Sequence, residues 1–214
     1  MGRKGLIYAV SVAALLSCPL TAQQRTRTMR DFLRLLASST NAARVVYQGG
    51  CDAASSNHII PPDVVVTKED SSQHGVAMVR AMLRNSKNVT VGELGGVVNV
   101  RIGAVDSAIL RMRIASLRLT ANQQYDPNEA IWALENSPDF QAEMRRRNTR
   151  MALMQGGLES IPAEGEPHLP LAVQNLTVGE VLDEVARTFS GTVVWGECRE
   201  SNGRTLISIT FTGH

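Results

Sequence analysis

Apolar residues recur along the chain at two spacings, and each spacing predicts a different kind of element. Apolar side chains every three or four positions predict amphipathic helices over 28–41, 72–85 and 178–189. Runs that are β-branched, or that alternate apolar and polar residues, predict strands. These runs are 44–47, 64–67, 89–93, 97–102, 111–120, 169–173, 192–195 and 205–212, with an irregularity expected at 115–116.

The middle of the chain carries two helix-start signals. Asp126 before Pro127 is typical of an N-cap followed by the first helical residue, and Ser137 before Pro138 restarts the pattern. We therefore expect central helices over 127–155. The segment 156–168 is rich in Gly, Pro and Glu, which predicts a flexible connection.

These elements predict an α+β fold made of two small related helix/strand modules, with mixed or antiparallel sheets packed by helices. The first module covers 25–105 and the second 106–214. The expected relation is a repeat: the helix over 28–37 and the strand 44–47 parallel the helix over 177–186 and the strand 193–195. The alternative is a chance match between two amphipathic helices that precede strands. The two strands end in Tyr47 and Trp195, and Cys51 and Cys198 follow a few residues later.

The first residues have the layout of a bacterial-type secretory signal. Arg3 and Lys4 precede an apolar run, 6–16, and then small and polar residues. The run is shorter than the roughly 20 apolar residues of a membrane-spanning helix. We expect residues 1–22 to be removed, leaving Gln23 first. Alternatively, Cys18 ends a lipoprotein-like motif and becomes lipidated, or the run is an internal helix of a cytoplasmic protein.

Composition narrows the classes of partner. The formal net charge is +2, and Arg3 and Lys4 supply that excess, so the mature chain is close to neutral. Proteins that bind nucleic acid usually show a basic excess, so we expect no nucleic-acid partner. No second apolar run of about 20 residues occurs, and we expect no membrane helix in the mature protein.

The sequence offers no pattern that predicts catalysis, a cofactor or a metal site. No two histidines have the i, i+4 spacing of a metal-binding helix, and no nucleophile or phosphate-binding motif occurs. Glu180, Asp183 and Glu184 share a predicted helix, so they could hold a hard cation or act in acid–base chemistry. The alternative is a solvated helix face on which Glu180 caps the helix start.

One basic run stands out. Arg145, Arg146, Arg147 and Arg150 lie in the predicted central helix, roughly opposite a stripe of Phe and Met side chains. Such a helix could dock on an acidic partner or an anionic lipid surface. The alternative is a Met-rich core stripe with a solvated outer face.

The cysteines predict one disulfide bond. Export removes or lipidates Cys18, which leaves Cys51 and Cys198 in an oxidising compartment. Both follow the aromatic end of a repeated strand, so neighbouring strands in a joint sheet would bring them together. The alternative is two unpaired thiols, one in each module.

The segment Thr177-Val-Gly-Glu-Val-Leu-Asp-Glu-Val-Ala186 and the strand that follows resemble the short N-terminal domain shared by secretins and TonB-dependent transducers, best over 171–211. That resemblance implies a fold and an envelope interaction role, without transport activity. We therefore expect an exported cell-envelope binding protein, periplasmic, extracellular or lipid-anchored, without catalysis or cofactors. Its expected partner is an envelope protein or a second copy, with membrane contact only through lipidation or peripheral docking. Alternatives are an exported hydrolase-like enzyme with a dispersed site, and an assembly protein that pairs through exposed sheet edges.

Overall fold

The computed structural model describes residues 29–50, 62, 64, 73–103, 105, 107–152 and 165–213. The predicted signal segment, Cys18, Cys51 and nearly all of the strand expected over 64–67 lie outside these residues. The first part of the fold contains α1 (Met29–Ser39), β1 (Ala43–Gly50), α2 (Gly75–Met82), β2 (Val89–Leu94) and β3 (Val97–Ile102).

The second part of the fold follows β3 along the chain. Its elements are β4 (Arg113–Arg118), α3 (Ala121–Tyr125), α4 (Pro127–Glu135), α5 (Pro138–Arg146), β5 (Thr149–Met151), β6 (Ala172–Thr177), α6 (Val178–Thr188), β7 (Gly191–Arg199) and β8 (Thr205–Gly213). None of the helices in the described ranges is long and apolar enough to cross a bilayer.

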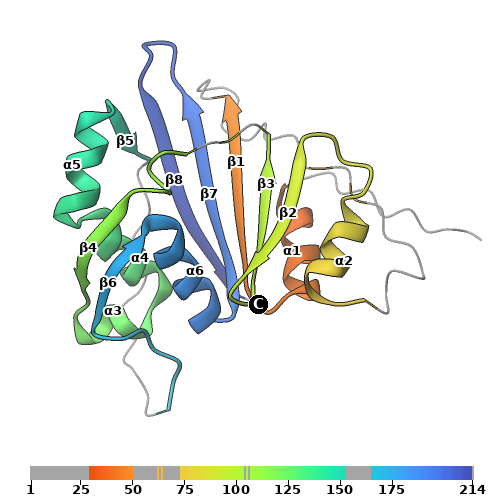
Figure 1. The fold of residues 1–214 in the computed structure, drawn as a ribbon, viewed down its shortest axis with the longest axis horizontal. Coiled ribbons are helices and arrows are strands. Elements are labelled where there is room, and N and C mark those ends of the chain that lie inside the picture. Colours follow the sequence, from red (N-terminus) through yellow and green to blue (C-terminus); the bar gives the residue numbers. More distant parts are fainter. Residues whose placement is uncertain are drawn as a thin grey trace, which may run out of the picture.

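One mixed sheet runs through the molecule and takes strands from both predicted modules. Its order is β2-β3-β1-β7-β8-β5, and a separate pair, β4-β6, lies beside it (Figure 1). β1 is parallel to both β3 and β7, whereas β2–β3 and β7–β8 are antiparallel. The predicted α+β class, with helices packed on a mixed sheet, is confirmed. The two strands of the sequence repeat, β1 and β7, are direct neighbours.

The two halves of the sheet are covered by helices on opposite faces. Alternate residues of a strand point to opposite faces, and in β1 Val45 packs with the core beneath α1 and α2, whereas Val46 packs with the core of α4, α5 and α6. Figure 1 shows α1 and α2 beside the β2–β3–β1 half and α4 to α6 beside the β7–β8 half. β1 therefore contributes to both cores.

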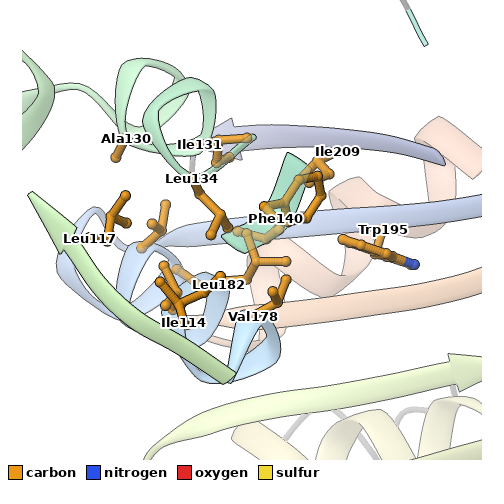
Figure 2. Packing of buried hydrophobic residues seen from close by; sticks show 14 of the residues in the cluster. Ile114, Leu117, Ala130, Ile131, Leu134, Phe140, Val178, Leu182, Trp195 and Ile209 are labelled. Carbon is orange, nitrogen blue, oxygen red and sulfur yellow. The ribbon is translucent and has the colours of Figure 1, made fainter. Parts of the chain in front are cut away.

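The larger core joins helices and strands that are far apart in the sequence. Figure 2 shows Ile131 and Leu134 of α4 converging with Leu182 of α6 and Ile209 of β8, and each of these side chains is fully buried. Phe140 of α5 closes the same cluster. Burying an apolar side chain of this size contributes about 1.5–3 kcal/mol, so this cluster fixes α4, α5 and α6 to the sheet.

The helix-start signals in the sequence are confirmed. The Asp126 carboxylate accepts the N–H of Asn128 at 2.7 Å and of Glu129 at 3.1 Å, and Pro127 is the first helical residue of α4. At α6 the Thr177 hydroxyl accepts the N–H of Glu180, whose carboxylate accepts the N–H of Thr177 at 2.7 Å. Both caps satisfy N–H groups that have no partner inside the helix.

The prediction of helix up to residue 155 is wrong. α5 ends at Arg146, Asn148 takes a φ of 51°, and the chain then forms β5, parallel to β8. The N–H of Ala152 donates to the carbonyl of Ile207 at 2.7 Å, which extends this pairing. Sheet pairing overrides the local helical pattern here. The expected strand over 169–173 is also displaced, because β6 begins at Ala172.

The irregularity expected at 115–116 is confirmed. β4 pairs Ile114 with Leu176 and Ser116 with Gln174, but Ala115 has no partner in the ladder. Asn175, which would lie opposite, has a φ of 53°. The N–H of Ala115 instead donates to the Asp139 carboxylate at 2.8 Å. The buried residues of β4 are therefore Ile114 and Leu117, which are three positions apart instead of the two or four of a regular strand.

Candidate functional site

Cys198 lies near the end of β7, where the register pairs it with Gly49 of β1. Cys198 is disulfide-bonded. The other cysteines of the chain, Cys18 and Cys51, lie outside the described residues. The predicted pairing with Cys51 therefore stays a prediction, and the neighbouring strands β1 and β7 are the arrangement on which that prediction depends.

The four arginines of the basic run do not share one helix face. Arg145 and Arg146 end α5, Arg147 is its C-cap, and Arg150 lies on β5. Arg146 and Arg147 both donate to Glu143, and these hydrogen bonds lower the pKa of the Glu143 carboxyl to about 2.

Arg150 pairs with Glu200 in the loop between β7 and β8. Because Arg146, Arg147 and Arg150 already hold carboxylates within the chain, an acidic partner would have to compete for them. Docking at these arginines stays a prediction.

The three carboxylates of α6 have three different surroundings. Glu180 caps the helix, as the alternative interpretation expected. Glu184 pairs with Arg187 at 2.7 Å on the outer face. Asp183 is buried and faces Arg44 of β1 at 3.5 Å. In the described part of the chain, no group of three His, Cys, Asp or Glu side chains could hold a metal ion.

The Arg44–Asp183 ion pair crosses between the two parts of the fold. Arg44 passes under the first turn of α6, where Gly179 leaves room for it. A Cβ atom at position 179 would overlap Arg44 Nη1 and lie 3.3 Å from Cζ. Asn99 lies opposite Arg44 on β3. The packing of β1 against α6 therefore needs a glycine at position 179 and places a charge pair in the interior.

This pair is strongly desolvated and incompletely hydrogen-bonded. Arg44 Nε and Nη1, Asp183 Oδ1 and Asn99 Oδ1 are buried and have no hydrogen-bond partner among the described residues. Burial raises the pKa of Asp183 to about 6, although the Arg44 cation partly opposes this rise. Burial also lowers the pKa of Arg44, and Asp183 opposes that shift. The pair costs desolvation energy that the attraction between its charges only partly offsets.

Glu135, the last residue of α4, is a second buried carboxylate. It is 7% exposed, and its Oε1 atom has no hydrogen-bond partner among the residues described. Burial raises the pKa of Glu135 from 4.5 to about 7. Because the folded-state pKa is raised, the protein gains stability from this group below pH 4.5 and loses it as the pH rises to about 7.

We expect Glu135→Gln to be more stable than the wild type above pH 7, by about 1–2 kcal/mol, and equally stable near pH 4.5. The gain is smaller than the full shift implies, because glutamine also lacks a partner there and solvent screens the charge. Urea unfolding of both proteins across this pH range measures the difference. A constant difference at all pH values would contradict the assignment.

A groove of about 450 Å³ lies between β4 and the junction of α4 and α5. Ser116, Leu117 and Arg118 of β4 form one wall, and Trp132 and Pro138 are on the other side. Trp132 is 53% exposed, whereas most large apolar residues of the described chain are buried. The groove thus combines an exposed aromatic ring with one side of a strand.

The outer edge of β4 faces this groove. Among the described elements, β4 has a strand partner only on its β6 side. The N–H of Leu119 donates to the Leu171 carbonyl at 2.9 Å, so Leu119 and Leu117 turn their backbone groups toward β6. Because backbone direction alternates along a strand, Ser116 and Arg118 turn theirs outward.

Side chains occupy the donors at both ends of this open edge. Asp139 accepts the N–H of Ala115, and the Gln123 amide oxygen accepts the N–H of Thr120 at 2.9 Å. Between them, the outward backbone groups of Ser116 and Arg118 have no hydrogen-bond partner among the described residues. The open edge is therefore short and has defined ends.

A second hollow, of about 600 Å³, lies between the end of α1 and the start of α2. The hydroxyl groups that line it already form hydrogen bonds with carbonyls in the last turn of α1. Ser38 and Ser39 donate to the Leu35 carbonyl, and Thr40 donates to the Leu36 carbonyl. The Leu36 carbonyl also accepts the backbone N–H of Thr40 at 3.0 Å, so these hydroxyls add second hydrogen bonds to carbonyls of the last turn. This polar wall therefore has a structural role.

Sequence reasoning missed Trp132, although a signal for it exists. Ala130, Ile131 and Leu134 form the buried stripe of α4. Trp132 is one residue off that stripe, which places a large aromatic ring on the flank of the helix. The sequence could not show that this flank lies beside the edge of β4, because β4 precedes the helix by a turn and by α3.

No protein-family model matches this chain, and no curated protein or solved structure matches it. The resemblance to the short N-terminal domain of secretins and TonB-dependent transducers therefore stays a prediction.

Proposed function

We propose that this chain is an exported cell-envelope protein that acts by binding another polypeptide rather than by catalysis. The observation that carries the proposal is the outer edge of β4, which lies beside the exposed ring of Trp132 in one groove. The charged start and short apolar run of the sequence support export.

An exposed strand edge with an adjacent groove suits a polypeptide ligand. An extended segment can add to such an edge through backbone hydrogen bonds, while the groove takes alternate side chains. Proteins commonly block free edges with charges or side chains to avoid unwanted pairing. Asp139 and Gln123 cover the donors on either side of the open part of β4, whereas no residue that the structure describes covers the outward backbone groups of Ser116 and Arg118.

Trp132 is the second reason to favour binding. Tryptophan is enriched among the residues that contribute most to protein interfaces, because it buries a large area with few rotatable bonds. In the described structure the other exposed large apolar residues are Leu94, in β2, and Leu171, just before β6.

Selection of binders from a random displayed peptide library against residues 23–214 tests this function. We expect enriched peptides to protect Trp132 from quenching by acrylamide. The chain has two tryptophans, and Trp195 is fully buried, so quenching reports mainly on Trp132. Binding should lower the quenching constant about twofold or more, because burial excludes the quencher.

The matched control is Trp132→Phe, which keeps an aromatic ring and removes the signal. Peptides that bind without protecting Trp132, or a selection that enriches none, would contradict the proposed site. Cleavage of the enriched peptides would instead favour the hydrolase-like alternative.

A further inference from the structure

We propose that the segment recognised at β4 is a short extended motif in which one bulky apolar residue is flanked by an acidic residue. This inference rests on the proposed function and specifies its ligand. It follows from the length of the open edge, the alternation of side chains along it and the charge beside it.

The length of the open edge limits the length of the motif. Asp139 and Gln123 occupy the N–H groups of Ala115 and Thr120. An added strand can therefore exchange backbone hydrogen bonds with Ser116 and Arg118 only. Three residues of the ligand cover this stretch, one opposite Ser116, one opposite Leu117 and one opposite Arg118.

Side-chain alternation sets the character of each position. Residues directly opposite each other on neighbouring strands point to the same face of the sheet. Leu117 points into the core and is 4% exposed, so the ligand residue opposite it also points inward. There it meets the part of the groove formed by Trp132 and Pro138. A bulky apolar side chain fits this position.

The charge of Arg118 determines which residue is favoured beside the apolar one in the ligand. Ser116 and Arg118 are exposed, so the two ligand residues opposite them point toward solvent. Arg118 is the one charged residue among the described residues that line the groove. Opposite charges on directly paired positions stabilise a strand pair. An acidic residue next to the apolar one is therefore favoured, and a basic residue is disfavoured.

A synthetic peptide of the form Ser-Thr-Asp-Leu-Asp-Thr-Ser tests the motif. It places a carboxylate opposite Arg118 whichever way the strand runs. We expect titration at low salt to shift the amide signals of Ser116 and Arg118 in NMR spectra of the mature chain. Two matched peptides, with Lys-Leu-Lys or Asp-Ser-Asp at the centre, should bind about threefold to tenfold more weakly.

Reversing the charge gives the sharpest control. Arg118→Glu should bind the Lys-Leu-Lys peptide better than the Asp-Leu-Asp peptide, while its circular dichroism and thermal midpoint remain those of the wild type. Equal binding of both peptides by both proteins, or no amide shift at millimolar peptide, would overturn the motif.

The two proposals can fail separately. Library peptides that protect Trp132 but lack an apolar residue beside an acidic one would leave the proposed function standing and overturn this inference. A library without peptides that protect Trp132 would overturn both.

Discussion

Arg44→Met is expected to lose about 2–3 kcal/mol of unfolding free energy between pH 6 and about pH 8, where the wild type loses little from this site. Burial raises the pKa of Asp183 from 3.8 to about 6 in the folded protein. Because the folded-state pKa is raised, the contribution of Asp183 to the unfolding free energy is largest below pH 3.8 and is lost as the pH rises to about 6. Above that value the contribution of the wild-type pair no longer changes.

Arg44 is the cation that limits this rise. Without it the folded-state pKa of Asp183 moves further up, so the loss of stability continues beyond pH 6, at about 1.4 kcal/mol for each pH unit. Urea unfolding of both proteins from pH 5 to pH 8 measures the effect. Glu135 titrates in both proteins and cancels in their difference.

The matched control is Asp183→Asn in the Arg44→Met background. It removes the titrating group, so the extra slope above pH 6 should disappear. Replacing the pair by Met and Leu should also remove the slope, because apolar residues of similar volume avoid the desolvation of both charges. Stability curves for Arg44→Met and wild type that stay parallel from pH 5 to pH 8 would show that Arg44 does not control the ionisation of Asp183.

The Arg44–Asp183 pair also shows where prediction from the sequence stops. The spacing of apolar residues predicted α6, and the Thr177–Glu180 cap was predicted from its sequence. Asp183, next to Leu182, was expected on a solvated face. α6 packs on both the sheet and α4, so its buried face is wider than one apolar stripe, and Asp183 lies inside it. That Arg44 faces Asp183 follows from the packing of β1 beneath α6, which the local sequence does not contain.

The prediction that the central helix ends at residue 155, where the structure ends it at Arg146, is wrong for a comparable reason. The stretch after Arg146 contains no glycine or proline that would predict an end, and its apolar residues continue the helical spacing. The end is set by Asn148, in a left-handed conformation, and by pairing of β5 with β8, more than 50 residues later in the chain. Local signals predicted where helices begin, whereas long-range pairing decided where this one ends. The groove beside Trp132 depends on such long-range packing too.

The largest stability effect is expected from the disulfide bond of Cys198. β1 and β7 are parallel neighbours, and Gly49 pairs with Cys198, so the sequence reaches Cys51 two residues after the position beside Cys198. A bond between Cys51 and Cys198 closes most of the mature chain into one loop. Loss of that constraint on the unfolded chain is expected to cost about 4–5 kcal/mol, less any strain in the folded state.

Three variants of the oxidised protein identify the pairing. Cys51→Ser and Cys198→Ser should each lower the unfolding free energy by this amount, and the double variant should lower it no further, because all three lack the same bond. Cys18→Ser is the matched control and should leave stability unchanged, since export removes or lipidates that residue. Non-reducing peptide mapping should recover one linked pair of peptides, containing Cys51 and Cys198. Recovery of a Cys18–Cys198 pair, or additive losses in the double variant, would overturn the pairing and with it the argument that the repeated strands bring their two cysteines together.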